Sequence, residues 1–169
     1  MKSLLNFVDS CIYLLIGPFT VLYLFPQFFR ELESHLYYLP FNYYLDKVGF
    51  VFMWSGAVLA ICCSLLMFLN KFSSVIPFFK PTKLVTYGPY KFVRHPMMWA
   101  LFLVLIGESI TFSSPLTLLW LIIWARFSHI YISRHEEPFL LRHFGKEYQQ
   151  YAQKVPRWIP GTKPHPIIK

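Results

Sequence analysis

The feature that most constrains this chain is an uncharged stretch of 22 residues, Val48 to Leu69. A membrane-spanning helix needs about 20 consecutive, mostly apolar residues. At about 1.5 Å of rise per residue, this stretch would extend about 33 Å as a helix. The composition agrees, because 56% of the residues are hydrophobic and only 14% are charged, against about 25% charged in typical soluble domains. We therefore expect lipid to be the main solvent of the fold.

Three further apolar stretches predict transmembrane helices at about residues 11–29, 97–110 and 115–133. The last two are separated by a polar turn, in which Ser113 or Ser114 can cap a helix that begins at Pro115. The sequence thus predicts an all-α, polytopic membrane protein that forms a single domain over residues 1–169. It has about four transmembrane helices, the last two forming a hairpin, and a cytoplasmic helical C-terminal tail.

The distribution of charge predicts the orientation of these helices. The chain carries 16 Lys and Arg residues against eight Asp and Glu residues, for a net charge of +8. With four crossings, every cation except Arg30 and Lys47 falls on the side of the two termini and of the 70–95 loop. Positively charged segments face the cytoplasm, so we expect both termini there. The membrane would be the inner membrane of a bacterium or archaeon, or the endoplasmic reticulum of a eukaryote. The positive charge then reports topology and does not indicate nucleic-acid binding.

One cytoplasmic segment, residues 80–96, is dense in polar and turn-forming residues. Within it, residues 87–90 read Tyr-Gly-Pro-Tyr, which predicts a turn. Arg94, His95 and Pro96 stand where a helix begins, and Pro96 suits its first position. Cationic side chains and free backbone N–H groups at such a place suit a carboxylate or a phosphate. The alternative is a basic loop that touches lipid headgroups.

The second polar segment contains two of the eight acidic residues side by side, Glu136 and Glu137, among several cations. A carboxylate there can accept a hydrogen bond from an amine or from a ribose hydroxyl. The alternative is an exposed helix end at which these acids pair with Arg134 or Arg142. We expect no metal, since the sequence His135-Glu136-Glu137 continues with Phe139 where a zinc motif of the H-E-x-x-H type has its second histidine.

Together the two segments resemble the integral-membrane methyltransferases, which include isoprenylcysteine carboxyl methyltransferase and the phospholipid N-methyltransferases. The first block is Thr82-x-Leu84-Val85-Thr86-x-Gly88-Pro89-Tyr90-x3-Arg94-His95-Pro96. After a hydrophobic hairpin, the second block is Glu136-Glu137-x7-Gly145-x-Glu147-Tyr148-x2-Tyr151-x3-Val155-Pro156-Arg157-x2-Pro160. The resemblance covers about residues 80–160, which would form the cofactor-binding half of the chain.

The resemblance implies that the chain binds S-adenosylmethionine at the cytoplasmic face. Carried over position by position, it implies that the cofactor contacts Thr82, Lys83, Leu84, Val85, Tyr90, His95, Pro96, Met97, Met98 and Glu136. These side chains suit the groups of that cofactor. His95 suits its carboxylate, Glu136 suits an amine or a hydroxyl, and the ring of Tyr90 suits the cationic sulfonium.

Methyl transfer requires alignment of acceptor and methyl group and exclusion of water. A carboxylate acceptor needs no general base, whereas an amine does, and Glu137, His135 or Tyr148 could serve. In isoprenylcysteine methyltransferases an arginine one turn before the glutamate helps to hold the substrate carboxylate. Ile132 takes that position here, and Arg134 is a candidate substitute. The predicted catalytic residues are therefore Glu137, Tyr148 and Arg134.

The resemblance implies a lipophilic acceptor that enters from the bilayer, either a prenylcysteine-like carboxylate or a phospholipid amine. Membrane lipids would surround the protein.

Two alternatives to a methyltransferase remain open. The first is an NADPH-dependent enzyme, because sterol reductases are similar to this family in their C-terminal half. The second is a membrane scaffold without catalytic activity.

Overall fold

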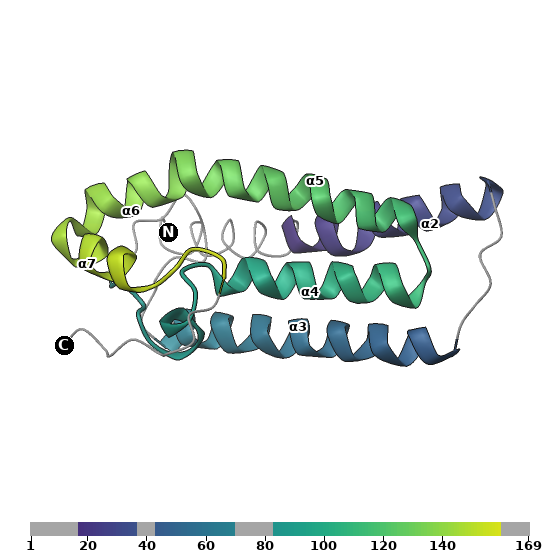
Figure 1. Ribbon diagram of the computed structural model, residues 1–169, viewed down its shortest axis with the longest axis horizontal. Coiled ribbons are helices and arrows are strands. Elements are labelled where there is room, and N and C mark those ends of the chain that lie inside the picture. The colour runs from purple at the N-terminus through teal and green to yellow at the C-terminus, as the bar shows by residue number, and fades with distance from the viewer. Residues whose placement is uncertain (1–16, 37–42, 70–82, 160–169) are drawn as a thin grey trace, which may run out of the picture. The chain divides into compact units, whose positions relative to one another are not determined.

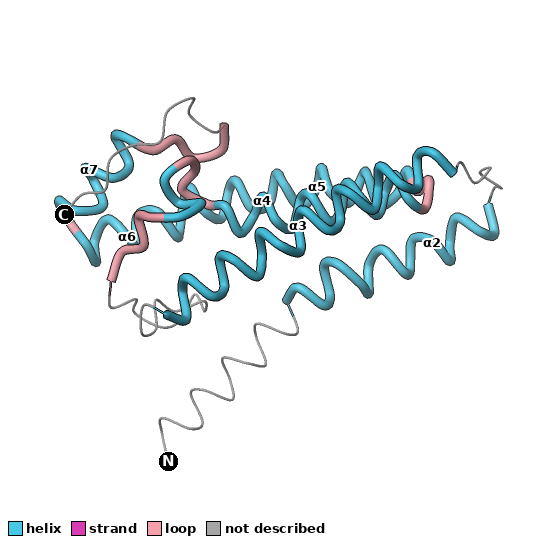
Figure 2. The backbone as a smooth tube through the Cα atoms, turned by 90° about the horizontal axis from the view of Figure 1, so that it is seen from below, coloured by secondary structure: helices cyan, strands magenta, loops and turns pink. Residues whose placement is uncertain are grey.

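The computed structural model describes residues 17–36, 43–69 and 83–159 (Figure 1). Helices account for nearly all of these residues, and the described ranges contain no β-strand, as the all-α prediction requires (Figure 2). The helical elements in chain order are η1 (Thr20–Leu24), α2 (Phe25–Leu36), α3 (Tyr43–Leu69), η2 (Gly88–Lys91), α4 (Pro96–Thr111), α5 (Pro115–Tyr131), η3 (Ile132–Glu136), α6 (Glu137–Phe144) and α7 (Lys146–Lys154). Elements η1 and η3 are π-helical turns, and η2 is a 3₁₀ turn.

Two helical stretches are long and apolar enough to cross a membrane, Leu45–Met67 and Pro115–Phe144. The shorter helix Pro96–Thr111 is also apolar. Side chains such as Val51, Trp54 and Val58 stay exposed along α3, at 68%, 69% and 61% of their surface. Exposed apolar surface of this extent suits contact with lipid and not with water. The helices agree with the predicted stretches at 48–69, 97–110 and 115–133.

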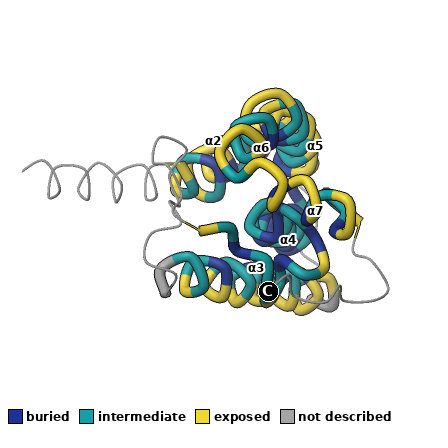
Figure 3. The backbone as a smooth tube through the Cα atoms, turned by 90° about the vertical axis from the view of Figure 1, so that its left-hand side faces the viewer, coloured by how far each residue is buried: buried dark blue, intermediate teal, exposed yellow. Residues whose placement is uncertain are grey.

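The chain divides into two compact units. The helical unit comprises Met1–Val58 and Ala100–Arg126, and the site unit comprises Leu59–Trp99 and Phe127–Lys169. In the helical unit, α4 lies between α3 and α5 (Figures 1 and 3). Helices α3, α4 and α5 each contribute one part to each unit.

A glycine allows α3 and α4 to approach closely in the helical unit. A Cβ atom added at Gly56 would lie 2.7 Å from the carbonyl oxygen of Ala100 and 2.8 Å from the Cγ2 atom of Val104. Real Cβ atoms essentially never make contacts that short, so only glycine fits while the helices stay at this separation.

The turn between α4 and α5 follows the predicted capping pattern. Ser114 is the residue that caps α5, because its Oγ accepts a hydrogen bond from the backbone N–H of Thr117 at 3.1 Å. A second cap comes from α2, where the Glu33 carboxylate accepts from the N–H of Leu116 at 2.7 Å. A carboxylate at a helix N-terminus also complements the helix dipole.

The first predicted helix differs in its bounds from the observed one. The sequence predicts a helix at about 11–29. Residues 11–16 of that range lie outside the described residues, and the observed helix continues to Leu36. The π-turn η1 precedes Pro26, whose nitrogen cannot donate to the preceding turn. The Glu33 side chain on this extension reaches the start of α5 and thereby gives the added turns a tertiary contact.

Candidate functional site

The polar residues of the site come from the loop just before α4, from η3 and the start of α6, and from the segment after α7, all of them in the site unit. As predicted, α4 begins at Pro96, and the turn at residues 87–90 forms the 3₁₀ element η2. Helix α5 continues through η3 into α6, and Pro138 is tolerated because it stands in the first turn of α6. A π-turn carries one residue more than an α-turn and shifts the side chains that follow. In this chain, η3 ends at Glu136, and Glu137 begins α6.

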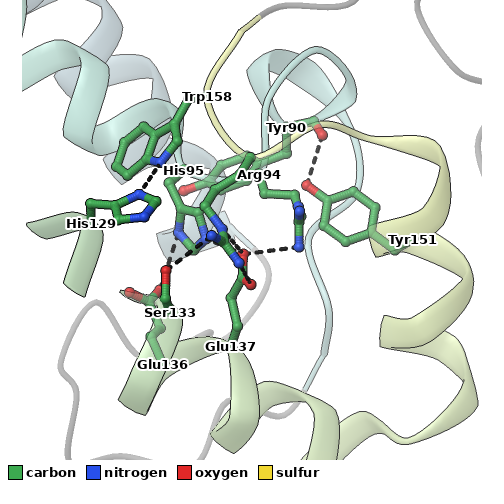
Figure 4. Close-up of polar contacts among 10 residues, drawn as sticks. Tyr90, Arg94, His95, His129, Ser133, Glu136, Glu137, Tyr151 and Trp158 are labelled. Atoms are coloured by element: carbon green, nitrogen blue, oxygen red, sulfur yellow. Dashed lines mark hydrogen bonds and ion pairs between the residues drawn. The ribbon is translucent and has the colours of Figure 1, made fainter. Parts of the chain in front are cut away.

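Two apolar clusters hold the polar loop in place. Val85 and Tyr90 are buried against Cys63 of α3, with Met97 packed beside them. Leu84 packs against a second cluster formed by Tyr148, Tyr151 and Val155. The hydroxyl of Tyr151 also donates to the carbonyl oxygen of Tyr90 at 2.8 Å (Figure 4). The loop is therefore fixed between α3 on one side and α7 on the other.

Glu137 is the centre of the polar network, and it is buried. Its Oε1 lies 2.9 Å from Nη1 of Arg94 and 3.3 Å from Nε2 of His95 (Figure 4). The Nε atom of Arg157 donates to the same oxygen at 2.9 Å, while Nη2 of Arg157 contacts Oε2. Three potentially cationic groups thus surround one carboxylate, which favours its ionised form.

Glu136 lies on the other side of the same histidine. Its Oε1 is 3.5 Å from Nδ1 of His95, and 38% of its side chain is exposed. Both ring nitrogens of His95 therefore face carboxylates. Only the doubly protonated imidazolium can donate from both nitrogens.

The surroundings of His95 act on its pKa in opposite directions. Burial of the ring disfavours its charged form, but hydrogen bonds to Glu136 and Glu137, together with their negative charge, outweigh this cost and raise the pKa above its ordinary value of 6.5. Hydrogen bonding to Glu137 raises the pKa of Arg157 in the same way, although burial opposes it.

Tyr148 is buried close to this network. Burial and the negative charge of Glu137 raise the pKa of its phenol to about 12, although Arg94 opposes the shift. The phenol therefore keeps its proton at neutral pH and is a poor base.

The remaining residues that were predicted to form the site differ in their surroundings. Pro96 is buried, Met98 is half-buried, and Lys83 is exposed. Arg134 is also exposed and takes no part in the ion pairs formed among the described residues. Thr82 lies outside the described residues.

Sequence reasoning did not include the C-terminal residues Arg157 and Trp158 in the site. Arg157 Nη1 donates to Ser133 Oγ at 2.9 Å, in addition to its contacts with Glu137. The Nε1 atom of Trp158 donates to Nδ1 of His129 at 2.9 Å, and the Trp158 carbonyl accepts from Nε1 of Trp99 at 2.8 Å. Pro156 and Arg157 stand in the second sequence block. The two adjacent glutamates of this apolar chain require cationic partners. Those two signals together could have indicated Arg157.

Comparison with known proteins identifies the family of the chain. Residues 45–147 match the family described as phospholipid methyltransferase. The chain is 36% identical over 80 residues to a probable protein-S-isoprenylcysteine O-methyltransferase of Oryza sativa subsp. indica, a match that covers 46% of this chain and 41% of that protein. It is 34% identical over 125 residues to the protein-S-isoprenylcysteine O-methyltransferase of Xenopus laevis, covering 71% of this chain and 42% of that protein.

A third relative has a different kind of name. The nickel-cobalt-cadmium resistance protein NccN of Alcaligenes xylosoxydans xylosoxydans is 34% identical over 86 residues, covering 48% of this chain and 38% of that protein. The chain spans only about two fifths of the length of each of these curated relatives. The family match covers more than half of the chain and includes most of α3, all of α4, α5 and α6, and both glutamates. Proteins named isoprenylcysteine O-methyltransferases are similar to the chain. The chain belongs to the phospholipid methyltransferase family.

Proposed function

We propose that this chain transfers the methyl group of S-adenosylmethionine to a lipophilic acceptor at the cytoplasmic face of a membrane. The observation that carries the proposal is the pairing of His95 with Glu136 and Glu137, which joins the two sequence blocks in one place. The donor, when bound, supplies a methyl group on a cationic sulfonium. The rest of the proposal concerns what the residues of this chain contribute.

The side chains present fit such a donor. Glu136 keeps part of its surface exposed, and among the described residues its carboxylate pairs with His95. It can therefore accept from an amine or a ribose hydroxyl of the donor. Half-buried Leu84, in the first block, and half-buried Met98, in the first turn of α4, offer apolar surface for the donor. Buried Tyr90 and Val85 give that loop a rigid base, so that the donor's binding groups need little reorganisation.

The state of Glu137 and Tyr148, two of the three candidate bases, favours an acceptor that is already nucleophilic. Glu137 is engaged by Arg94, His95 and Arg157, and Tyr148 holds its proton at neutral pH. A carboxylate acceptor needs no base, whereas a protonated amine does. The relatives named O-methyltransferases agree with oxygen as the accepting atom. We therefore propose a prenylcysteine-like carboxylate in preference to a phospholipid amine.

The proposal also includes the membrane topology. The helices Leu45–Met67 and Pro115–Phe144 and the shorter apolar helix Pro96–Thr111 would supply three of the four crossings. With both termini in the cytoplasm, His95 and the two glutamates would lie at the cytoplasmic end of the last hairpin. A lipophilic acceptor could then reach them from the bilayer while its tail stays in lipid.

The experiment that tests this function is methyl labelling. Native membranes, a farnesylated cysteine with a free carboxylate, and phosphatidylethanolamine are each incubated with the purified chain and methyl-labelled donor. We expect label in the cysteine derivative that alkali releases as methanol, because esters hydrolyse and N-methyl groups do not. The variant Glu136→Gln should transfer at least 10-fold less, and the exposed-residue variant Arg142→Gln should match the unaltered chain. Alkali-stable label in the phospholipid would overturn the proposed acceptor, and no enzyme-dependent label in any sample would overturn the transfer itself.

A further inference from the structure

The C-terminal segment Val155–Trp158 follows α7 and returns to the start of α4. The backbone N–H of Arg94 donates to the carbonyl oxygen of Pro156 at 2.9 Å. Val155 is buried in the cluster with Tyr148 and Tyr151. Together with the hydrogen bonds of Trp158 to His129 and Trp99, these interactions anchor the segment to the start of α4, to α5 and to α7.

Arg157 is the charged residue of this segment, and it binds both oxygens of Glu137. Nε reaches Oε1 at 2.9 Å and Nη2 reaches Oε2, while Nη1 donates to Ser133 Oγ at 2.9 Å. Arginine presents a planar set of donors that matches a carboxylate in this bidentate way. The guanidinium therefore fixes both the position and the orientation of the Glu137 carboxylate.

The orientation of Glu137 determines what His95 can do. Glu137 Oε1 receives His95 Nε2 at 3.3 Å, and the opposite ring nitrogen faces Glu136 at 3.5 Å. Among the described residues, Arg157 is the donor that contacts Oε2 of Glu137. Without Arg157, this buried oxygen would need another donor, and His95 and Arg94 are the cationic groups within reach. A shift of the carboxylate toward them would draw the His95 ring away from Glu136.

We propose that Arg157 is a positioning residue for the donor site, because it orients Glu137 and, through His95, the donor-binding carboxylate of Glu136. Glu137 in this account is an anchor and not a base. The inference rests on the proposed function, in which Glu136 binds the methyl donor. The contact between Arg157 and Glu137 is independent of that function and has a readout of its own.

The test uses the full chain in detergent, with S-adenosylhomocysteine as the binding probe. We expect Arg157→Gln to weaken its binding at least 10-fold and to raise the KM for the methyl donor while the KM for the acceptor stays unchanged. Arg157→Lys should recover part of the loss, because lysine keeps the charge but loses the planar pair of donors. The matched control Arg142→Gln removes an exposed cation of α6 and should bind normally.

Two further measurements separate positioning from a general loss of fold. Hydrogen exchange at the Arg94 amide, which is bonded to Pro156, should speed up in Arg157→Gln with no donor present. The double variant Glu137→Gln with Arg157→Gln should bind the probe no more weakly than Glu137→Gln alone, because the two residues act as one unit. If Arg157→Gln does not fold, the variant Ser133→Ala tests the positioning role instead. It removes one contact of Arg157 and should weaken the binding of S-adenosylhomocysteine several-fold.

The outcomes are distinguishable. If the unaltered chain binds no S-adenosylhomocysteine, the proposed function is overturned, while the exchange of the Arg94 amide still decides whether Arg157 holds the segment. If the unaltered chain binds the probe and Arg157→Gln binds it within twofold, the positioning role alone is overturned. If Arg157→Gln does not fold and Ser133→Ala binds the probe as the unaltered chain does, the positioning role is also overturned.

Discussion

At the scale of single residues, two adjacent glutamates occupy different environments. Glu137 is buried and held by two arginines, whereas Glu136 is partly exposed and, among the described residues, pairs with the ring of His95. Identical side chains thus lie in different environments, which determine which partners remain accessible to each. The sequence indicates that this pair of acids is unusual, but the sequence alone cannot assign the two roles.

The raised pKa of His95 predicts a pH dependence of stability. In the unfolded chain the imidazole titrates near its ordinary pKa of about 6.5, and in the folded chain Glu136 and Glu137 hold the proton to higher pH despite the opposing effect of burial. The stabilisation by the imidazolium is therefore complete below pH 6.5 and is lost as the pH rises through the folded pKa. Arg94 and Arg157 also form ion pairs with Glu137 and so add positive charge near His95.

This effect is measured by thermal unfolding in detergent at a series of pH values between about 5.5 and 9, spaced by about one pH unit. We expect the unaltered chain to lose stability above pH 6.5 relative to His95→Gln, which lacks the titrating group. Parallel stability curves for the two proteins over the whole range would show that His95 gains no proton affinity on folding.

At the scale of elements, local signals predicted helix boundaries well. Pro96 begins α4 and Ser114 caps α5, as expected from residues that act within one turn of themselves. The π-turn η3 was not predicted, because a π-turn has no comparable residue signature. The extension of α2 to Leu36 was also missed, since the contact of Glu33 with α5 joins residues 83 positions apart.

The close approach of α3 and α4 gives a stability prediction for one element pair. Gly56→Ala places a Cβ atom against the backbone of Ala100, which cannot move aside as a side-chain tip can. We expect a loss of about 1–3 kcal/mol, as is typical of an overpacked core. The matched control is Gly17→Ala, because a Cβ atom there has no neighbour within 4 Å.

Thermal unfolding of both variants in the same detergent provides the measurement. The control should unfold at or above the temperature of the unaltered chain, since alanine favours a helix more than glycine does. Equal unfolding temperatures for Gly56→Ala and the unaltered chain would mean that the two helices can separate without cost.

At the scale of the whole molecule, the apolar stretches and the two polar blocks were sufficient to predict an all-helical chain of this family. The site was predicted in part. Residues close to each other in the sequence, such as Arg94 and His95, were recognised as a group. Arg157 was not, because its partner Glu137 lies 20 positions away and the packing of Val155 brings the two together. Periodicity and turn signals carry no information about such distant pairs.

In the proposed function, His95 and Glu136 bind the methyl donor, and every other step depends on this binding. The decisive measurement is a thermal shift of the detergent-solubilised chain with S-adenosylhomocysteine and, separately, with NADPH. A ligand at about 100 times its dissociation constant stabilises a protein by about 2.7 kcal/mol. We predict such a shift with S-adenosylhomocysteine, its loss in Glu136→Gln, and none with NADPH. A shift with NADPH alone, or the same shift in Glu136→Gln as in the unaltered chain, would contradict the account.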